Sequence, residues 1–244
     1  NHPYKSISKA LSKAKGGTEV RIRNGEYKEN ITITKDVKVV GNSKDRGKVV
    51  IKADKKDEPV VTMRDDAELM HLTVKDGKHG VRVEGGAEAH IYNVHAKNNR
   101  KDGISLQEAP RKTKQQAVID KSKVTGNGRA GVYAEKRQLT LKDTEITGNG
   151  SDGIDFEAGV EAWVADNTIS SNGGSGAVFV IDGSEVWTKN NSIRYNKREG
   201  IEINSYGAAG QVGIKKASLI GNSRYGIAKV ARTTSALSGM NAVI

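Results

Sequence analysis

The 244-residue sequence contains no cysteine, so neither disulfide bonds nor thiolate metal sites are available to it. Aromatic residues make up 5% of the chain and hydrophobic residues 35%, which is less apolar bulk than a compact globular core normally contains. No apolar run approaches the roughly 18 residues of a membrane-spanning helix, so no membrane span is expected. No signal peptide is visible, and the chain begins at Asn1 without a methionine, which leaves removal of an upstream segment open.

Acidic residues are the minority among the charged ones. The chain has 40 Lys and Arg against 29 Asp and Glu, a net charge of +11 and a pI near 9.6. Such a charge attracts polyanions such as acidic polysaccharide or nucleic acid, although a solvated lysine-rich surface is the alternative. The sequence lacks aromatic platforms for single strands and a reading element for duplex grooves, so nucleic acid is not expected as a partner.

A seven-residue step recurs along the chain. In it a small or branched apolar residue is followed three positions later by asparagine and seven positions later by glycine. Successive asparagines stand 22 to 28 residues apart, which is the signature of a solenoid. The step carries Asn99 and Gly103, Asn127 and Gly131, Asn149 and Gly153, Asn172 and Gly176, Asn196 and Gly200, and Asn222 and Gly226.

Each glycine of the step opens a short strand with alternating inward and outward residues, as at Ile154 and Phe156. The strands are too closely spaced for crossover helices. Each should therefore pair in parallel with the equivalent strand of the next coil of the solenoid, which we also call a lap. We expect an all-β fold, a single-stranded right-handed parallel β-helix of about eight or nine coils. The expected single domain spans 1–244, with a helical cap at 1–17, coils at 18–230 and a tail or cap at 231–244.

The recurring asparagines predict a structural ladder. An asparagine inside a turn can satisfy exposed backbone groups, and stacked asparagines can bond to one another along the solenoid axis. A cap is predicted at the N-terminus, because Ile7, Ala10, Leu11 and Ala14 fall at helical spacing and Gly17 ends the pattern.

The opening of the chain resembles a known family. The segment from Tyr4 to Ala14, the stretch from Gly17 to Ile31 and the Asn-x-x-x-Gly-Ile coils are similar to the pectate-lyase-like right-handed β-helix superfamily. That superfamily includes polysaccharide lyases, hydrolases, epimerases, esterases and non-catalytic surface proteins, so the resemblance implies the fold but not one reaction. It also implies a secreted or cell-surface location.

Three columns of outward residues flank the glycines, because equivalent positions on successive laps are neighbours. The columns are acidic although the protein is basic. Two residues after each glycine stand Arg82, Ser105, Tyr133, Asp155, Val178 and Glu202. Four after stand Glu84, Gln107, Glu135, Glu157, Val180 and Asn204, and just before stand His79, Asp102, Ala130, Asp152, Ser175 and Glu199.

The candidate catalytic residues are Tyr133, Asp152, Asp155 and Glu157. Asp155 and Glu157 share one face of one strand at about 6.5 to 7 Å. Carboxylates so placed shift each other's pKa and could hydrolyse a glycosidic bond. They could equally hold Ca²⁺ through oxygen ligands, or form a solvated surface.

The segment from Asn149 to Asp155 is also similar to the Asn-Thr-Asp-Gly-x-Asp signature of the polygalacturonase branch, which would make Asp152 a general acid. The following coil, around Ser175, lacks the paired aspartates of that branch.

Two insertions should flank the acidic columns on one edge, at 110–114 and 205–210. Together with nearby basic residues, the first forms a predicted basic wall that could grip the carboxylates of a uronic-acid chain. The residues expected to bind substrate are Arg82, Asp102, Arg111, Lys112, Lys114, Arg129, Glu135, Lys136, Arg137 and Glu202.

The histidines and the two tryptophans are weaker candidates for functional residues. The five histidines show no metal-ligand spacing and are interpreted as surface or turn residues, so no metal ligand set is predicted. Trp163 and Trp187 occupy equivalent positions of neighbouring coils; outward rings could bind sugars, but the pattern favours packing.

Two functions follow from these observations. The first is an enzyme or binding protein for an acidic, uronic-acid-containing polysaccharide, acting as a lyase, hydrolase or epimerase, and expected to be a monomer. The alternative is a non-catalytic structural or adhesive module of a cell-surface protein.

Overall fold

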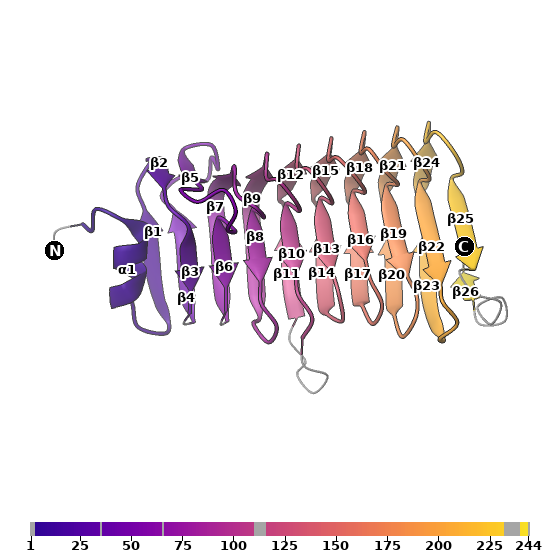
Figure 1. The fold of residues 1–244 in the computed structure, drawn as a ribbon, viewed down its shortest axis with the longest axis horizontal. Helices are drawn as coiled ribbons and strands as arrows, with labels where there is room; N and C mark the ends of the chain where they lie inside the picture. Colours follow the sequence, from indigo (N-terminus) through magenta and orange to yellow (C-terminus); the bar gives the residue numbers. More distant parts are fainter. Residues whose placement is uncertain (1–2, 35, 65, 110–115, 232–239, 244) are drawn as a thin grey trace.

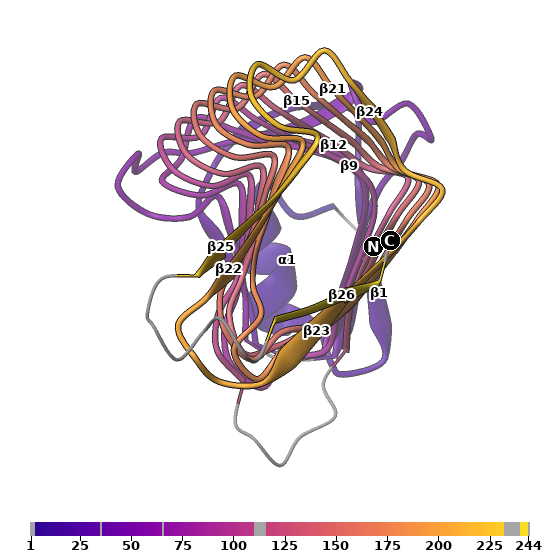
Figure 2. The same cartoon turned by 90° about the vertical axis from the view of Figure 1, so that its right-hand side faces the viewer.

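The computed structural model describes residues 3–34, 36–64, 66–109, 116–231 and 240–243. The chain winds into one continuous stack of laps, with the N-terminal laps at one end and the C-terminal laps at the other (Figure 1). Seen along the stack, the laps superimpose and enclose a single interior (Figure 2). The parallel β-helix expected from the repeat is confirmed. No helix in the described part of the chain is long and apolar enough to cross a bilayer.

The N-terminal cap is the helix α1 (Ile7–Lys13). The Oγ of Ser6 accepts a hydrogen bond from the Lys9 N–H, which satisfies a free amide of the first turn. Ile7 and Leu11 are buried, and the helix lies across the end of the interior (Figure 2). The predicted helix is confirmed, and it covers apolar residues of the first laps that would otherwise face water.

Among the described residues, the smaller of the two sheets has nine parallel strands, each from a different lap. Most have three residues, and all but the first two, which follow Asn30 and Val60, come directly after a glycine. They are β3 (Ile31–Ile33), β6 (Val61–Met63), β8 (Val81–Val83), β10 (Ile104–Leu106), β13 (Val132–Ala134), β16 (Ile154–Phe156), β19 (Ala177–Val180), β22 (Ile201–Ser205) and β25 (Ile227–Ala231).

The larger sheet has 17 strands among the described residues. Two parallel ladders share the long strands β7 (Ala67–Lys75) and β9 (Ala89–Lys97). The first ladder continues with β1 (Thr18–Ile22), β4 (Val37–Gly41), β11 (Gln116–Asp120), β14 (Gln138–Lys142), β17 (Glu161–Ala165), β20 (Glu185–Lys189), β23 (Gly210–Lys215) and β26 (Met240–Val243). The second continues with β2 (Gly25–Lys28), β5 (Val49–Lys52), β12 (Lys123–Thr125), β15 (Glu145–Thr147), β18 (Thr168–Ser170), β21 (Ser192–Arg194) and β24 (Ser218–Ile220).

The C-terminal segment was expected to be a tail or cap over 231–244. Within it, β26 pairs in parallel with β23, so residues 240–243 extend the first ladder by one strand. Residues 232–239 and 244 lie outside the described part of the chain.

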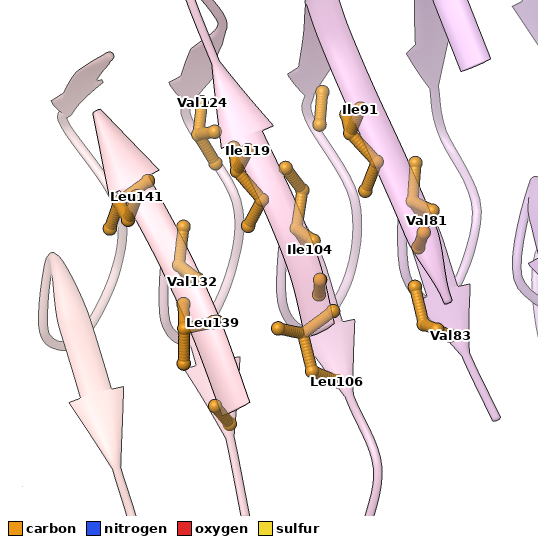
Figure 3. Close-up of a cluster of buried hydrophobic side chains, with 14 of the residues drawn as sticks. Val81, Val83, Ile91, Ile104, Leu106, Ile119, Val124, Val132, Leu139 and Leu141 are labelled. Atoms are coloured by element: carbon orange, nitrogen blue, oxygen red, sulfur yellow. The ribbon is translucent and has the colours of Figure 1, made fainter. Parts of the chain in front are cut away.

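The core is a set of aliphatic columns along the axis. Val81, Ile104 and Val132 are in register on successive strands of the smaller sheet, and all three are fully buried. Ile91 and Ile119 approach them from the larger sheet (Figure 3). Small aliphatic side chains fill this narrow interior, which explains how so little apolar sequence can form a continuous core.

The asparagine ladder is confirmed, and all its members are buried except Asn222, which is partly buried. Each Nδ2 donates to the Oδ1 of the asparagine one lap further on, at 2.8 to 3.0 Å, as between Asn149 and Asn172. That Oδ1 also accepts the backbone N–H of the preceding asparagine, and Nδ2 also donates to a backbone carbonyl such as that of Ile146. The side chains therefore replace the backbone partners that the turns lack.

A second buried ladder lies five residues before the first. Asn167 donates from Nδ2 to Asn191 Oδ1 at 3.0 Å, and its own Oδ1 accepts the N–H of Thr144. Thr144 Oγ1 accepts in turn from the N–H of Ser122 at 3.3 Å. This ladder does not stand out in the sequence, because its positions mix Ser, Thr and Asn.

Candidate functional site

The acidic columns lie on the outer side of the smaller sheet. We call this surface the acidic face and define it by the outward side chains of β8, β10, β13, β16, β19 and β22 with the residues just before and after each strand. The predicted order is confirmed by the pairing of Arg82, Ser105, Tyr133, Asp155, Val178 and Glu202 in parallel register. Residues more than 100 positions apart in sequence thereby share one surface.

Arg129 holds the centre of the acidic face together. It lies in the turn before β13, from which its guanidinium reaches carboxylates on both sides. Its Nε is 3.1 Å from Asp102 Oδ1, and its Nη2 donates to Asp155 Oδ2 at 3.2 Å. The guanidinium carbon also lies 4.7 Å from the ring centre of Tyr133, in cation–π contact. One arginine thus links three laps.

The acidity of Asp155 is altered by its surroundings. Burial in the face, reinforced by the neighbouring Glu157 carboxylate, raises the pKa of Asp155 to about 6, against the opposing effect of Arg129. A carboxyl group ordinarily titrates near 4. Asp155 therefore exchanges its proton in a range where it can act as a general acid.

Tyr133 is held beside Asp155 as a hydrogen-bond donor. Its hydroxyl donates to Glu135 Oε2 at 3.2 Å. Burial, followed by the charge of Glu135, raises the pKa of Tyr133 well above its usual range. The phenol therefore stays protonated at neutral pH, and it can position a ligand but is a poor base.

Asp152, the general acid suggested by the polygalacturonase resemblance, lies in the turn before β16. Its Oδ1 accepts the N–H of Ser175 at 2.6 Å, and its Oδ2 accepts from Ser151 Oγ at 3.0 Å. Both oxygens are therefore engaged in holding the turns of two adjacent laps together.

The C-terminal half of the acidic face is neutralised by two arginines, of which Arg224 lies 3.6 Å from Glu199. Arg198 lies 3.4 Å from both Glu199 and Glu202, and Ser175 Oγ is 3.1 and 3.2 Å from the same two carboxylates. Asn204 donates to Glu202 at 3.1 Å. Glu202, a predicted substrate-binding residue, is 3% exposed within this network.

The predicted basic wall is only partly present among the described residues. Lys136 is on the surface, with Nζ 2.9 Å from Glu108. Arg137 is not on the wall: it is 2% exposed, and its Nη2 donates to the carbonyl of Ala87, two laps earlier. Its long side chain runs along the inside of the corner, where burial lowers its pKa. The predicted wall residues Arg111, Lys112 and Lys114 lie outside the described part of the chain.

Three further predicted positions have local partners. Arg82 lies on the acidic face with Nε 3.9 Å from Glu84. Asp102, 2% exposed, is paired with Arg129 and lies 3.2 Å from His79 Nδ1. The insertion at 205–210 is anchored by Asp182, whose carboxylate accepts the N–H groups of Tyr206 and Ala208.

The histidines are not all surface residues. His79 is 7% exposed beside Asp102. His95 projects from β9, and its Nε2 is 2.8 Å from Thr125 Oγ1. Burial, with Lys97 nearby, lowers the pKa of His95 to about 4, so this ring is neutral at pH 7. No group of three or more histidine, aspartate or glutamate side chains suited to a metal ion occurs among the residues that the structure describes.

The fold and the acidic face define a right-handed β-helix protein with a carboxylate cluster on one sheet. The family profile described as "Right handed beta helix region" matches residues 79–239, which is more than half of the chain. The chain belongs to this family. Comparison with curated protein sequences finds no match.

Several solved structures have a similar fold. The pectate lyase Pel9A has a TM-score of 0.65 at 14% identity, with 94% of this chain and 75% of that chain covered. The Dettilon tailspike protein has a TM-score of 0.52 at 13% identity, covering 84% of this chain and 50% of that one. An alginate lyase from Paenibacillus sp. str. FPU-7 has a TM-score of 0.50 at 11% identity, covering 96% of both. At such low identity the likeness establishes the fold alone.

The altered acidity of Asp155 has a consequence for stability that needs no substrate. Between about pH 4 and pH 6 the folded protein holds a proton on Asp155 that the unfolded chain has released, so stability falls as pH rises through that window. Asp155→Asn removes this loss. From the pKa shift, the variant should gain about 2 kcal/mol relative to the parent between pH 4 and pH 8.

The measurement is thermal unfolding of both proteins at several pH values. The opposite contribution of His95 is common to both proteins and cancels in their difference. A difference in melting temperature that does not change with pH would show that Asp155 titrates normally.

Proposed function

We propose that this protein cleaves an acidic, uronic-acid-containing polysaccharide on the acidic face, with Asp155 as the proton donor to the glycosidic oxygen. The proposal rests chiefly on one observation: the partly buried Asp155 carboxyl accepts a hydrogen bond from Arg129 and neighbours a second carboxylate, an environment that raises its pKa to about 6. Pairs of carboxyl groups in unlike environments are the usual acid and base of glycoside hydrolysis.

The roles of the neighbouring residues follow from their positions. Asp155 and Glu157 are two residues apart in extended chain, so their Cβ atoms are about 6.5 to 7 Å apart. Carboxyl groups on side chains so placed can lie far enough apart to admit a water molecule, as in an inverting pair, in which Glu157 activates a water while Asp155 protonates the leaving oxygen. The protonated Tyr133 donates a hydrogen bond beside them. When Asp155 is protonated, Arg129 loses one counter-charge and can bind a substrate carboxylate.

The acidic character of the substrate is supported by charge and by the fold. A net charge of +11 attracts a polyanion over long range. The similar structures include a pectate lyase and an alginate lyase, and pectate and alginate are both polymers of uronic acids. Such substrates lie outside cells, which agrees with the secreted or cell-surface location that we propose.

A substrate panel tests the proposal. The protein is incubated with polygalacturonate, alginate and neutral dextran, and both new reducing ends and near-ultraviolet absorbance are followed. We expect reducing ends from a uronate polymer, none from dextran, and no absorbance of an unsaturated product. A product that absorbs in the near ultraviolet would show that the protein cleaves by β-elimination and not by hydrolysis. Absence of both cleavage and retention on every glycan would refute the proposed function.

The second candidate is a non-catalytic structural or adhesive module. The observation that favours it is the closed network of Arg198, Glu199 and Glu202, in which charges are satisfied within the protein instead of being held ready for a ligand. Retention on a uronate polymer without any cleavage, equal in the parent and in Asp155→Asn, would support this candidate.

A further inference from the structure

Two tryptophans stand exposed on the sheet that does not carry the acidic face. Trp163 in β17 and Trp187 in β20 are paired in register, and they are 45% and 39% exposed. Their inward neighbours Val164 and Val186 are buried. The sequence favoured packing in the core or between coils. Packing in the core is wrong, because strand alternation directs both indole rings to the surface, whereas packing between coils is present at Trp187, whose ring lies against Gly213.

The ring of Trp187 lies flat on the next lap because that lap has a glycine at the equivalent position. A Cβ atom added to Gly213 would stand 2.0 Å from Cε3 and 2.2 Å from Cζ3 of Trp187. The indole N–H donates to Glu185 Oε1 at 2.8 Å, which restrains the position of the ring. One face of the ring is thus seated on backbone while the other is open to solvent.

Lysines flank the tryptophans on one side. Lys189 and Lys215 are paired in register two positions beyond the tryptophan column, and Lys216 follows. Together with both tryptophans they line a surface depression of about 460 Å³. None of the three lysines has a salt bridge with any described residue. This surface, which we call the tryptophan platform, therefore combines an apolar ring surface with lysines that form no ion pair with a described residue, while the Glu185 carboxylate contacts the indole N–H of Trp187.

The geometry points to a second glycan-binding site. We propose that the tryptophan platform binds an anionic polysaccharide, with the apolar faces of sugar rings stacked on Trp163 and Trp187 and their carboxylates paired with Lys189 and Lys215. Adjacent laps are about 4.8 Å apart, so the two rings offer one continuous strip along the axis. The identity of the ligand rests on the proposed function, but the site itself lies on a different sheet from the acidic face.

Such a site has a clear use in a protein that acts on a polymer. A chain held at the platform stays near the acidic face of the same molecule, which raises its effective concentration there. Affinity for long polymers should therefore depend on the platform, whereas cleavage of short oligosaccharides should not.

Tryptophan emission tests the proposal directly, because the sequence contains only these two tryptophans. The protein is titrated with polygalacturonate, alginate and dextran while emission is recorded. We expect a saturable change with at least one of the uronate polymers, weakened by added salt, and none with dextran. Gly213→Ala, which displaces the ring of Trp187, and Lys189→Ala/Lys215→Ala should each weaken binding about tenfold or more. Tyr4→Ala, at an exposed aromatic far from the platform, should not.

The outcomes separate the two proposals. Cleavage of uronate polymer without any saturable change in emission would overturn the platform and leave the proposed function standing. An equal response to dextran would overturn the anionic ligand. A saturable response that survives in Asp155→Asn, and is lost in Gly213→Ala without loss of cleavage of short oligosaccharides, would establish the platform as a separate site.

Discussion

Replacement of Asp155 by asparagine is expected to lower the rate of cleavage of a uronate polymer by about 100-fold or more, which is the usual contribution of a general acid. Asparagine keeps the size of the side chain and can still accept a hydrogen bond from Arg129. Its amide is not acidic enough, however, to protonate a leaving oxygen. The loss should appear in kcat, because Arg129 and Tyr133 remain in place to bind the substrate.

The pH dependence gives the same prediction an independent form. Cleavage by the parent should fall as pH rises through about 6, where Asp155 loses its proton. The residual rate of Asp155→Asn should not fall as pH rises through about 6. Glu145→Gln is the matched control, since Glu145 is a carboxylate of the larger sheet, paired with Lys123. Equal rates for Asp155→Asn and the parent would remove Asp155 from the mechanism.

Replacement of Asn172 by leucine is expected to cost about 4 kcal/mol of folding free energy. The Oδ1 of Asn172 accepts two N–H groups of Asn149, and its Nδ2 donates to Asn196 Oδ1 and to the carbonyl of Ile146. Leucine has a similar size but leaves these buried groups without partners. Asn172 bonds to a ladder asparagine on each side, so its replacement interrupts the ladder in its interior.

Thermal unfolding measures this effect, and a fall of roughly 10 °C in melting temperature corresponds to a loss of that size. Asn42→Ala, at an exposed asparagine outside the ladder, provides the control and should change little. Asn222→Ala should cost less than Asn172→Leu, since Asn222 is the last of the repeated asparagines and is only partly buried. Equal melting temperatures for Asn172→Leu and the parent would mean that the ladder does not stabilise the fold.

The fold was accessible from the sequence because its signals are local and repeated. One asparagine and one glycine in constant phase defined the lap, and alternation within three residues assigned the inward side. The second ladder could have been found in the same way, since Ser122, Thr144, Asn167 and Asn191 each stand five residues before a repeated asparagine. This second ladder was harder to recognise, because serine, threonine and asparagine all meet the same hydrogen-bonding requirement in it.

For the candidate site, the sequence predicted only which residues line up in columns on successive strands. Strand register placed Tyr133 above Asp155 correctly. The partners of the long side chains did not follow from register, because an arginine can reach one or two laps in either direction. Arg129 therefore crosses to two carboxylates, whereas Arg137 turns inward to Ala87, although both had been expected to bind substrate.

By itself, then, the sequence determined the lap, the ladder, the capping helix and the order of residues along each column, because each of these depends on neighbours close in sequence or on a constant repeat. The tertiary structure alone decided which carboxyl is buried enough to hold its proton near pH 6 and which charges are neutralised within the protein. It also decided that Trp163 and Trp187 face outward. Burial and electrostatic pairing depend on atoms contributed by several laps at once, and no single segment of the chain specifies that environment.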